Sequence, residues 1–119
     1  MEILPDQESL AIAPFERELR AQLRLLVTEP LIQSYLAHPE GPHGDALQRL
    51  LTYFRRAPVA GKYALLMEVP FKAYRIVKLS GRRGLPPVRV DDRVYTSQRE
   101  AEKAVFLRRV QDMLAAEEG

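Results

Sequence analysis

The chain has 119 residues, of which 46% are hydrophobic and 29% charged, contains no cysteine and carries a formal charge of +2. A chain of this length forms one domain and can bury a core without a covalent staple. The absence of cysteine excludes disulfides, thiolate metal sites and a cysteine nucleophile. Two histidines cannot make a histidine-only catalytic zinc site, which needs three protein ligands.

The apolar runs are only a few residues long, so the sequence predicts no membrane span. The first residues, Met1 to Asp6, lack a cationic region before an apolar stretch, so we expect no secretory signal. These two observations favour a cytoplasmic protein.

Charge is distributed unevenly along the chain. Residues 1–44 carry three basic and seven acidic side chains, residues 45–109 carry fifteen and six, and the last ten carry three acidic ones. Fourteen of the eighteen basic residues are arginine, which is enriched at protein interfaces. The positive middle segment fits an acidic protein surface or nucleic acid, and the third interpretation is a solvated face with local ion pairs.

The first part of the chain reads as helix. From Ala13 to Val27 the apolar residues recur at helical spacing, with Pro14 in the first turn and residues 1–9 frayed. Pro30 breaks this helix, and a second short helix follows until the prolines after His38 stop it.

Asp45 is predicted to cap the next helix. Its apolar stripe consists of Leu47, Leu50, Leu51 and Phe54. Two strands follow, Lys62 to Val69 and Tyr74 to Leu79, on a connection short enough for an antiparallel pair. A flexible basic loop comes next, and residues 88–95 can supply a third strand interrupted at Asp91-Asp92.

The last helix is predicted to run from Gln98 to about Ala116, with Ser97 and Glu100 forming a capping box. Its apolar residues cover more than one stripe, so it must bury two sides, one against the sheet and one against something else. The order of elements predicts an α+β fold: an N-terminal helical arm (residues 1–42), then an α+β core (residues 43–119) with a helix, a small antiparallel sheet and a C-terminal helix. The whole forms a single domain.

The sequence offers no convincing catalytic or metal site. His38 and His43, with Glu40 between them, could ligate zinc or iron(II), but nearby prolines restrict their convergence and loop histidines are ordinary. The neighbouring Asp91-Asp92 carboxylates diverge and fit a turn better than paired acid–base chemistry.

Three arginine pairs stand out: Arg55-Arg56, Arg82-Arg83 and Arg108-Arg109. Nucleic-acid binding would need them on one face together with aromatic side chains for stacking. The first pair also suits a helix C-terminus. The third pair, inside a largely apolar helix, suggests ion pairs at the edge of a buried contact. Arg82-Arg83 tips a loop with no assigned role.

Several ordered motifs carry a family resemblance. They are Leu47-Gln48-Arg49, Tyr53-Phe54-Arg55-Arg56-Ala57-Pro58, Gly61-Lys62-Tyr63, Ala73-Tyr74-Arg75-Ile76, Gly84-Leu85-Pro86 and Ala104-Val105-Phe106-Leu107-Arg108-Arg109-Val110-Gln111-Asp112. In this order they resemble the small subunit of N,N-dimethylformamidase over roughly residues 38–114, and the first 30 residues resemble it only as a helical arm.

The resemblance implies an accessory chain that packs on a large catalytic subunit. In that family the large chain holds an iron, ligated by tyrosines and a carboxylate, that activates water to hydrolyse dimethylformamide. The resemblance implies no catalytic residue, cofactor or metal in this chain, whose shared residues would be scaffold and contact positions. These positions are Tyr53, Phe54, Arg55, Arg56, Tyr74, Arg75, Phe106, Arg108 and Arg109. The chain departs from the family in its short acidic N-terminus and its Arg82-Arg83 loop, which leaves open the partner's substrate.

The leading hypothesis is therefore a non-catalytic small subunit that stabilises an iron-dependent amidohydrolase chain, so the chain by itself is not expected to be an enzyme. The alternative is a small basic nucleic-acid-binding or regulatory protein. A stand-alone hydrolase ranks last, and a homo-oligomer that replaces the large partner stays open.

Overall fold

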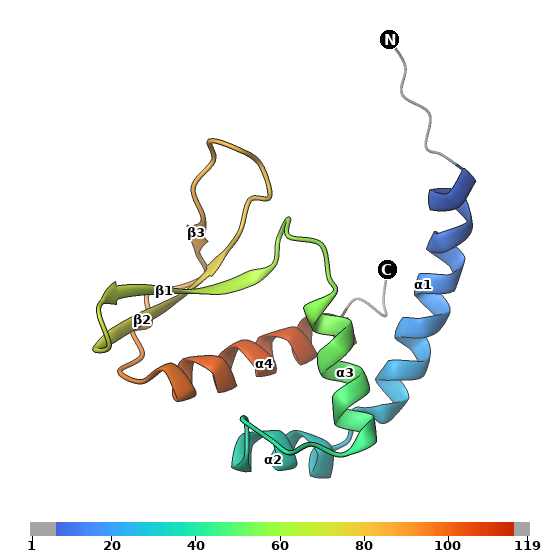
Figure 1. Cartoon of the computed structure of the whole chain (residues 1–119), viewed down its shortest axis with the longest axis horizontal. Coiled ribbons are helices and arrows are strands. Elements are labelled where there is room, and N and C mark those ends of the chain that lie inside the picture. The colour runs from blue at the N-terminus through green and yellow to red at the C-terminus, as the bar shows by residue number, and fades with distance from the viewer. Residues whose placement is uncertain (1–6, 116–119) are drawn as a thin grey trace.

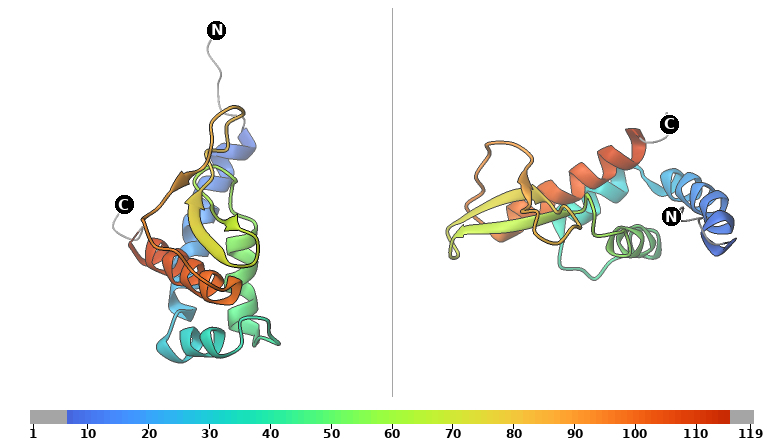
Figure 2. Two further views of the ribbon diagram at one scale, coloured as in Figure 1. Left: turned by 90° about the vertical axis from the view of Figure 1, so that its left-hand side faces the viewer. Right: turned by 90° about the horizontal axis from the view of Figure 1, so that it is seen from above.

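The computed structural model describes residues 7–115, with side chains from Glu16 onward. Over this range the chain forms four helices and one three-stranded antiparallel sheet, which confirms the predicted α+β class (Figure 1). Helix α4 lies between the sheet and the other helices, and α1 runs along one side of the molecule next to α3 (Figures 1 and 2). No helix in the described part of the chain is both long and apolar enough to cross a membrane.

Helix α1 (Gln7–Leu26) begins six residues before the predicted start. The prediction of a frayed segment is wrong for residues 7–9, and residues 1–6 lie outside the described part. Glutamine, glutamate, leucine and alanine before Pro14 are strong helix formers, so the helix extends through the proline, which therefore lies in its interior rather than in its first turn.

Helix α2 (Glu29–Ala37) confirms the predicted break before Pro30. Thr28 is its N-cap, with Oγ1 accepting a hydrogen bond from the Leu31 N–H at 3.3 Å. Pro30 lies in the first turn, where its missing N–H is not needed, and His38 caps the C-terminus.

Helix α3 (Asp45–Arg55) buries the predicted leucine and phenylalanine stripe. The predicted cap is wrong, because Gly44 is the N-cap and Asp45 is the first helical residue. The Asp45 carboxylate instead pairs with Arg49 one turn later, at 3.2 Å, and its negative charge suits the helix N-terminus.

The sheet consists of β1 (Tyr63–Val69), β2 (Ala73–Lys78) and β3 (Val88–Arg89), in that order. The predicted hairpin is confirmed, with an irregularity at Glu68 between Met67 and Val69. The third strand is shorter than predicted. Beyond β3 the segment contacts β2 again through the Val90 N–H, which donates to the Ile76 carbonyl oxygen at 3.1 Å, and through an isolated bridge from Tyr95 to Tyr74. The interruption falls where the sequence placed it, because an Asp91 carboxylate oxygen accepts a hydrogen bond from the Arg93 N–H at 2.9 Å and turns the chain.

Helix α4 (Gln98–Ala115) starts at the predicted N-cap, where Ser97 Oγ accepts a hydrogen bond from the Glu100 N–H at 3.1 Å. It separates two clusters of buried side chains. The helical core contains Leu23, Leu31, Tyr35, Leu47, Leu50, Phe54, Phe106, Val110 and Met113. The sheet core contains Tyr63, Tyr74, Ile76, Tyr95, Ala101 and Val105.

This arrangement confirms that α4 buries two sides and identifies what covers the second one. The second apolar side of α4 is covered by the chain's own helices, so it does not by itself require a partner protein. The sequence pattern identified two buried sides correctly, but it could not show that α1, α2 and α3 fold back to cover the second one.

Candidate protein interface

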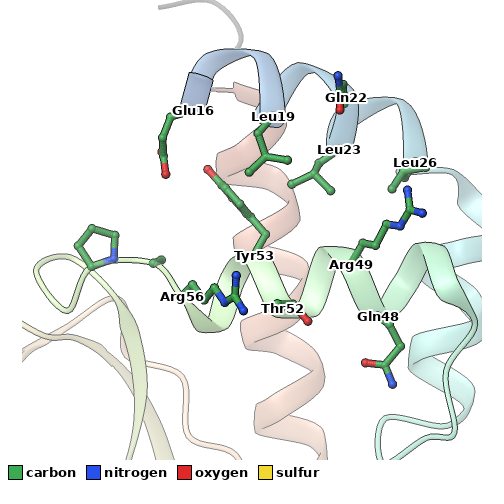
Figure 3. Close-up of a pocket in the computed structure, with 12 residues that line it drawn as sticks. Glu16, Leu19, Gln22, Leu23, Leu26, Gln48, Arg49, Thr52, Tyr53 and Arg56 are labelled. Carbon is green, nitrogen blue, oxygen red and sulfur yellow. The ribbon is translucent and has the colours of Figure 1, made fainter. Parts of the chain in front are cut away.

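A groove of about 630 Å³ lies between α1 and α3. Figure 3 shows Leu19 and Leu23 pointing from α1 toward α3, and Tyr53 pointing from α3 back toward α1. Leucines recur along α1 at three- and four-residue spacing, so one face of the helix is apolar and only part of it is covered. The lining residues are Glu16, Leu19, Gln22, Leu23, Leu26, Gln48, Arg49, Thr52, Tyr53, Arg56, Ala57 and Pro58.

The groove combines an apolar floor with a basic border. Arg49 and Arg56 line it, and Glu16 is the one acidic residue among the lining side chains. Burial raises the pKa of Tyr53, and the nearby Arg20 charge acts in the opposite direction. Arg20 Nε is buried without a hydrogen-bond partner in the described part of the chain. A partner surface that offers apolar and acidic groups would therefore complement this groove.

The nine residues that the resemblance assigned to scaffold or contact positions separate into three groups. Phe54, Tyr74 and Phe106 are buried in the cores and act as scaffold. The Phe106 ring stacks on Tyr35 with centroids 4.0 Å apart and meets Phe54 edge-on at 6.3 Å. Little of these side chains is available for a partner.

The second group lies at the C-terminal end of α3. Tyr53 is half-buried in the groove, and Arg56 is exposed at its border. Arg55 is also exposed but does not line the groove, and its carbonyl oxygen accepts a hydrogen bond from Lys62 Nζ at 2.8 Å. The structure thus distinguishes two adjacent arginines that the sequence treated alike.

The third group consists of arginines held by partners within the chain. Glu68 Oε1 lies 2.8 Å from Arg75 Nε and 2.5 Å from Arg89 Nη2, so one carboxylate links all three strands. Hydrogen bonding to Arg75 is the main cause that lowers the pKa of Glu68. Arg75 Nη1 is nevertheless buried without a hydrogen-bond partner among the described residues.

Arg108 and Arg109 join α4 to the sheet and its loop. Arg108 forms an ion pair with Asp91, and Arg109 donates to the Tyr63 carbonyl oxygen at 3.4 Å. The predicted ion pair is confirmed for Arg108, whereas the contact given for Arg109 is a hydrogen bond to a backbone carbonyl. The Tyr63 hydroxyl donates to Asp112, and burial together with this bond raises the pKa of Tyr63 to about 12.

The two histidines do not converge with acidic residues into a metal site. His43 Nε2 lies 3.1 Å from the Pro39 carbonyl oxygen, and its ring faces Tyr35 with centroids 6.0 Å apart. Within residues 7–115 no three His, Asp or Glu side chains are grouped so that they could hold a metal ion.

Sequence reasoning missed the groove itself. It recognised the helical spacing of the apolar residues in α1 but made no prediction about what this stripe contacts. It also gave no weight to Leu25, which lies off that stripe and is 82% exposed. Leu25 does not line the groove, so its exposure does not point to it.

The sequence of this chain is similar to those of known proteins. Residues 10–119 match the family described as N,N-dimethylformamidase alpha subunit. The chain is 33% identical to the N,N-dimethylformamidase alpha subunit of Alcaligenes sp. over 104 residues, which covers 84% of this chain and 77% of that protein. It is 40% identical to the alpha subunit of Paracoccus aminophilus over 79 residues, covering 66% of this chain and 52% of that protein, about half its length. The resemblance noted in the sequence is confirmed, and the chain belongs to the N,N-dimethylformamidase alpha subunit family.

Proposed function

We propose that this chain is the non-catalytic small subunit of an amide hydrolase, and that it packs on and stabilises a large catalytic chain through the groove between α1 and α3. The large chain holds the iron and hydrolyses a small amide of the dimethylformamide type. The observation that carries the proposal is family membership over most of the chain, joined to an open apolar groove with a basic border.

The chemistry of the described residues supports an accessory role. Most of the buried side chains belong to the two cores, and no buried polar or charged residue is found among those described. The polar side chains at the contact between α4 and the sheet are engaged in pairs: the Tyr63 hydroxyl donates to Asp112, and Arg108 forms an ion pair with Asp91. Tyr63 has a raised pKa and so keeps its proton, which makes it a poor nucleophile or base near neutral pH.

The groove offers what an interface needs. The half-buried Leu19 and Tyr53 supply an apolar centre above the buried Leu23, and aromatic residues are favoured at such positions. Arg49 and Arg56 at the border can pair with carboxylates of the large chain and so determine its orientation. Helix α1 is longer than α3 and continues past the part of α3 that it contacts (Figure 1). A partner could therefore contact α1 beyond the groove as well.

The proposal is tested by isolating the tagged chain from its own host at physiological ionic strength. We expect a large polypeptide to co-purify, the complex to contain iron, and the complex to hydrolyse dimethylformamide or a related small amide. Recovery of the chain alone would overturn the proposal. Iron bound in stoichiometric amount by the lone chain would also contradict it, because the metal is assigned to the partner.

The adjacent arginines provide a matched pair of variants. Arg56→Glu reverses a charge at the border of the groove, and we expect it to reduce recovery of the large chain. Arg55→Glu makes the same change one residue away, outside the groove, and should leave recovery close to that of the unmodified chain. Equal effects of both variants, with equal thermal stability, would refute the assignment of the interface to the groove.

The nucleic-acid alternative remains a prediction of the basic middle segment. Three of its arginines, Arg75, Arg89 and Arg108, are already engaged by Glu68 and Asp91, which reduces the charge left for phosphates. Fluorescence anisotropy with duplex and single-stranded DNA tests this alternative. Binding through phosphate contacts should be detectable at low salt, and its affinity should fall steeply as the salt concentration rises.

A further inference from the structure

Among residues 7–115, strand β1 is an edge strand, with β2 on one side and no strand on the other (Figure 2, right). In an antiparallel sheet, successive residues direct their N–H and C=O groups to opposite sides of the strand. Tyr74 and Ile76 bond toward the third-strand segment, to Tyr95 and Val90. The alternate β2 residues therefore face β1.

The register between β1 and β2 shows to which side each β1 residue directs its backbone groups. Leu66 is opposite Arg75 and Ala64 is opposite Val77, so these two bond inward to β2. The Leu79 N–H donates to the Lys62 carbonyl oxygen at 2.9 Å, which confirms the alternation. Tyr63, Leu65 and Met67 consequently direct their backbone N–H and C=O groups to the free edge.

At one end of this edge a backbone group is occupied within the chain, and at the other end the strand turns into the hairpin. The Tyr63 carbonyl oxygen accepts a hydrogen bond from Arg109. Val69 follows the irregularity in the strand, and its carbonyl oxygen accepts a bond from the Lys72 N–H at 2.9 Å. Between them, no described residue is recorded as a partner for the outward backbone groups of Leu65 and Met67.

The part of the edge from Tyr63 to Met67 lacks the features that usually prevent strand pairing, because the irregularity, the Glu68 charge and Pro70 all lie at its far end. Natural edge strands carry charges, prolines or strong bulges that discourage association. Apart from Glu68, β1 is composed of apolar residues and tyrosine, and the Glu68 charge is neutralised by Arg75 and Arg89. Leu66 is 40% exposed although it lies in the middle of the strand.

We propose that this edge pairs with the same edge of a second copy of the chain, antiparallel, about a two-fold axis that passes between the two Leu66 residues. Leu65 of one copy then faces Met67 of the other, and each such pair exchanges two backbone hydrogen bonds. A register centred on Leu65 would need the occupied Tyr63 carbonyl, and one centred on Met67 would need the occupied Val69 carbonyl. The chosen register is the one in which both members of every bonded pair are free.

The side chains agree with this symmetry. Leu66 meets Leu66 of the second copy on one face of the sheet, and Leu65 meets Met67 on the other. Glu68 faces Ala64, so no like charges are brought together. The two sheets become one of six strands.

The size of the contact determines how strongly it should form. A standard stable interface buries about 800 Å² on each partner. A contact made of four backbone hydrogen bonds and a short strip of apolar side chains is smaller than that. We therefore expect a monomer–dimer equilibrium that depends on protein concentration rather than a permanent dimer.

The test uses the full chain and does not involve the large subunit, so it stands or falls separately from the proposed function. Sedimentation velocity should show dimer increasing with concentration. Leu66→Lys and Leu66→Glu should each yield monomer, since like charges then meet at the axis, and an equimolar mixture of the two should pair again. Val94→Lys is the control, because Val94 is similarly exposed, at 44%, and lies away from β1.

Amide hydrogen exchange tests the register. Protection of the Leu65 and Met67 N–H groups should rise with concentration, whereas those of Ala64 and Leu66 should be protected throughout. An unmodified chain that stays monomeric at every concentration would overturn the proposal. So would a mixture of the two charged variants that fails to pair, or a dimer whose Leu65 and Met67 amides exchange as in the monomer.

Discussion

Replacing Phe106 by alanine should destabilise this chain more than any change on its surface. The side chain is 2% exposed and fills the helical core where α4 meets α2 and α3. Truncating a buried phenylalanine to alanine costs about 3–5 kcal/mol. Within that loss, the ring contacts with Tyr35 and Phe54 contribute about 0.5–1.5 kcal/mol each. Domains of this size have a free energy of unfolding of about 5–15 kcal/mol, so the variant should be marginally folded.

Urea denaturation followed by circular dichroism measures this loss. With a slope of about 2 kcal/mol per molar, a loss of about 4 kcal/mol lowers the midpoint by about 2 M. Leu107→Ala is the control, because Leu107 is the next residue and is exposed. It should cost less than about 1 kcal/mol. Equal midpoints for the two variants would refute the placement of Phe106. A normal midpoint combined with loss of the large chain would instead make Phe106 a contact residue.

Two further outcomes are expected. Gly81→Ala should destabilise the chain more than Gly84→Ala. Both glycines have a positive φ, a conformation that costs alanine about 1–2 kcal/mol. Only at Gly81 would the new Cβ also clash, since it would lie 2.7 Å from the Cα of Ala60. Equal thermal midpoints for the two variants would contradict this. Tyr63→Phe should remove one tyrosine ionisation near pH 12 from the ultraviolet titration, because burial and Asp112 keep the hydroxyl protonated in the folded state. The stability that this raised pKa contributes is complete below pH 10 and is lost as the pH rises toward 12, so the variant should lose less stability over that interval; an ionisation at the ordinary value of 10 would contradict the assignment.

Local patterns in the sequence predicted most of the elements. The break before Pro30, the stripe on α3, the hairpin and the Ser97 cap all depend on residues within a few positions of one another. The start of α1 was misplaced, because Pro14 was expected in the first turn and instead lies in the interior of the helix. The cap of α3 was misassigned by one position, since Gly44 and Asp45 both suit a helix N-terminus.

The sequence alone determined the α+β class, the family and the two-sided burial of the last helix, since periodicity and ordered motifs are properties of the chain. Only the tertiary structure decided what covers that second side, and it is the chain's own helices. The same holds for the difference between Arg55 and Arg56, for the arginines that Glu68 engages, and for the outward direction of the Leu65 and Met67 backbone groups. These depend on which distant segments meet, and spacing along one element carries no information about contacts between elements.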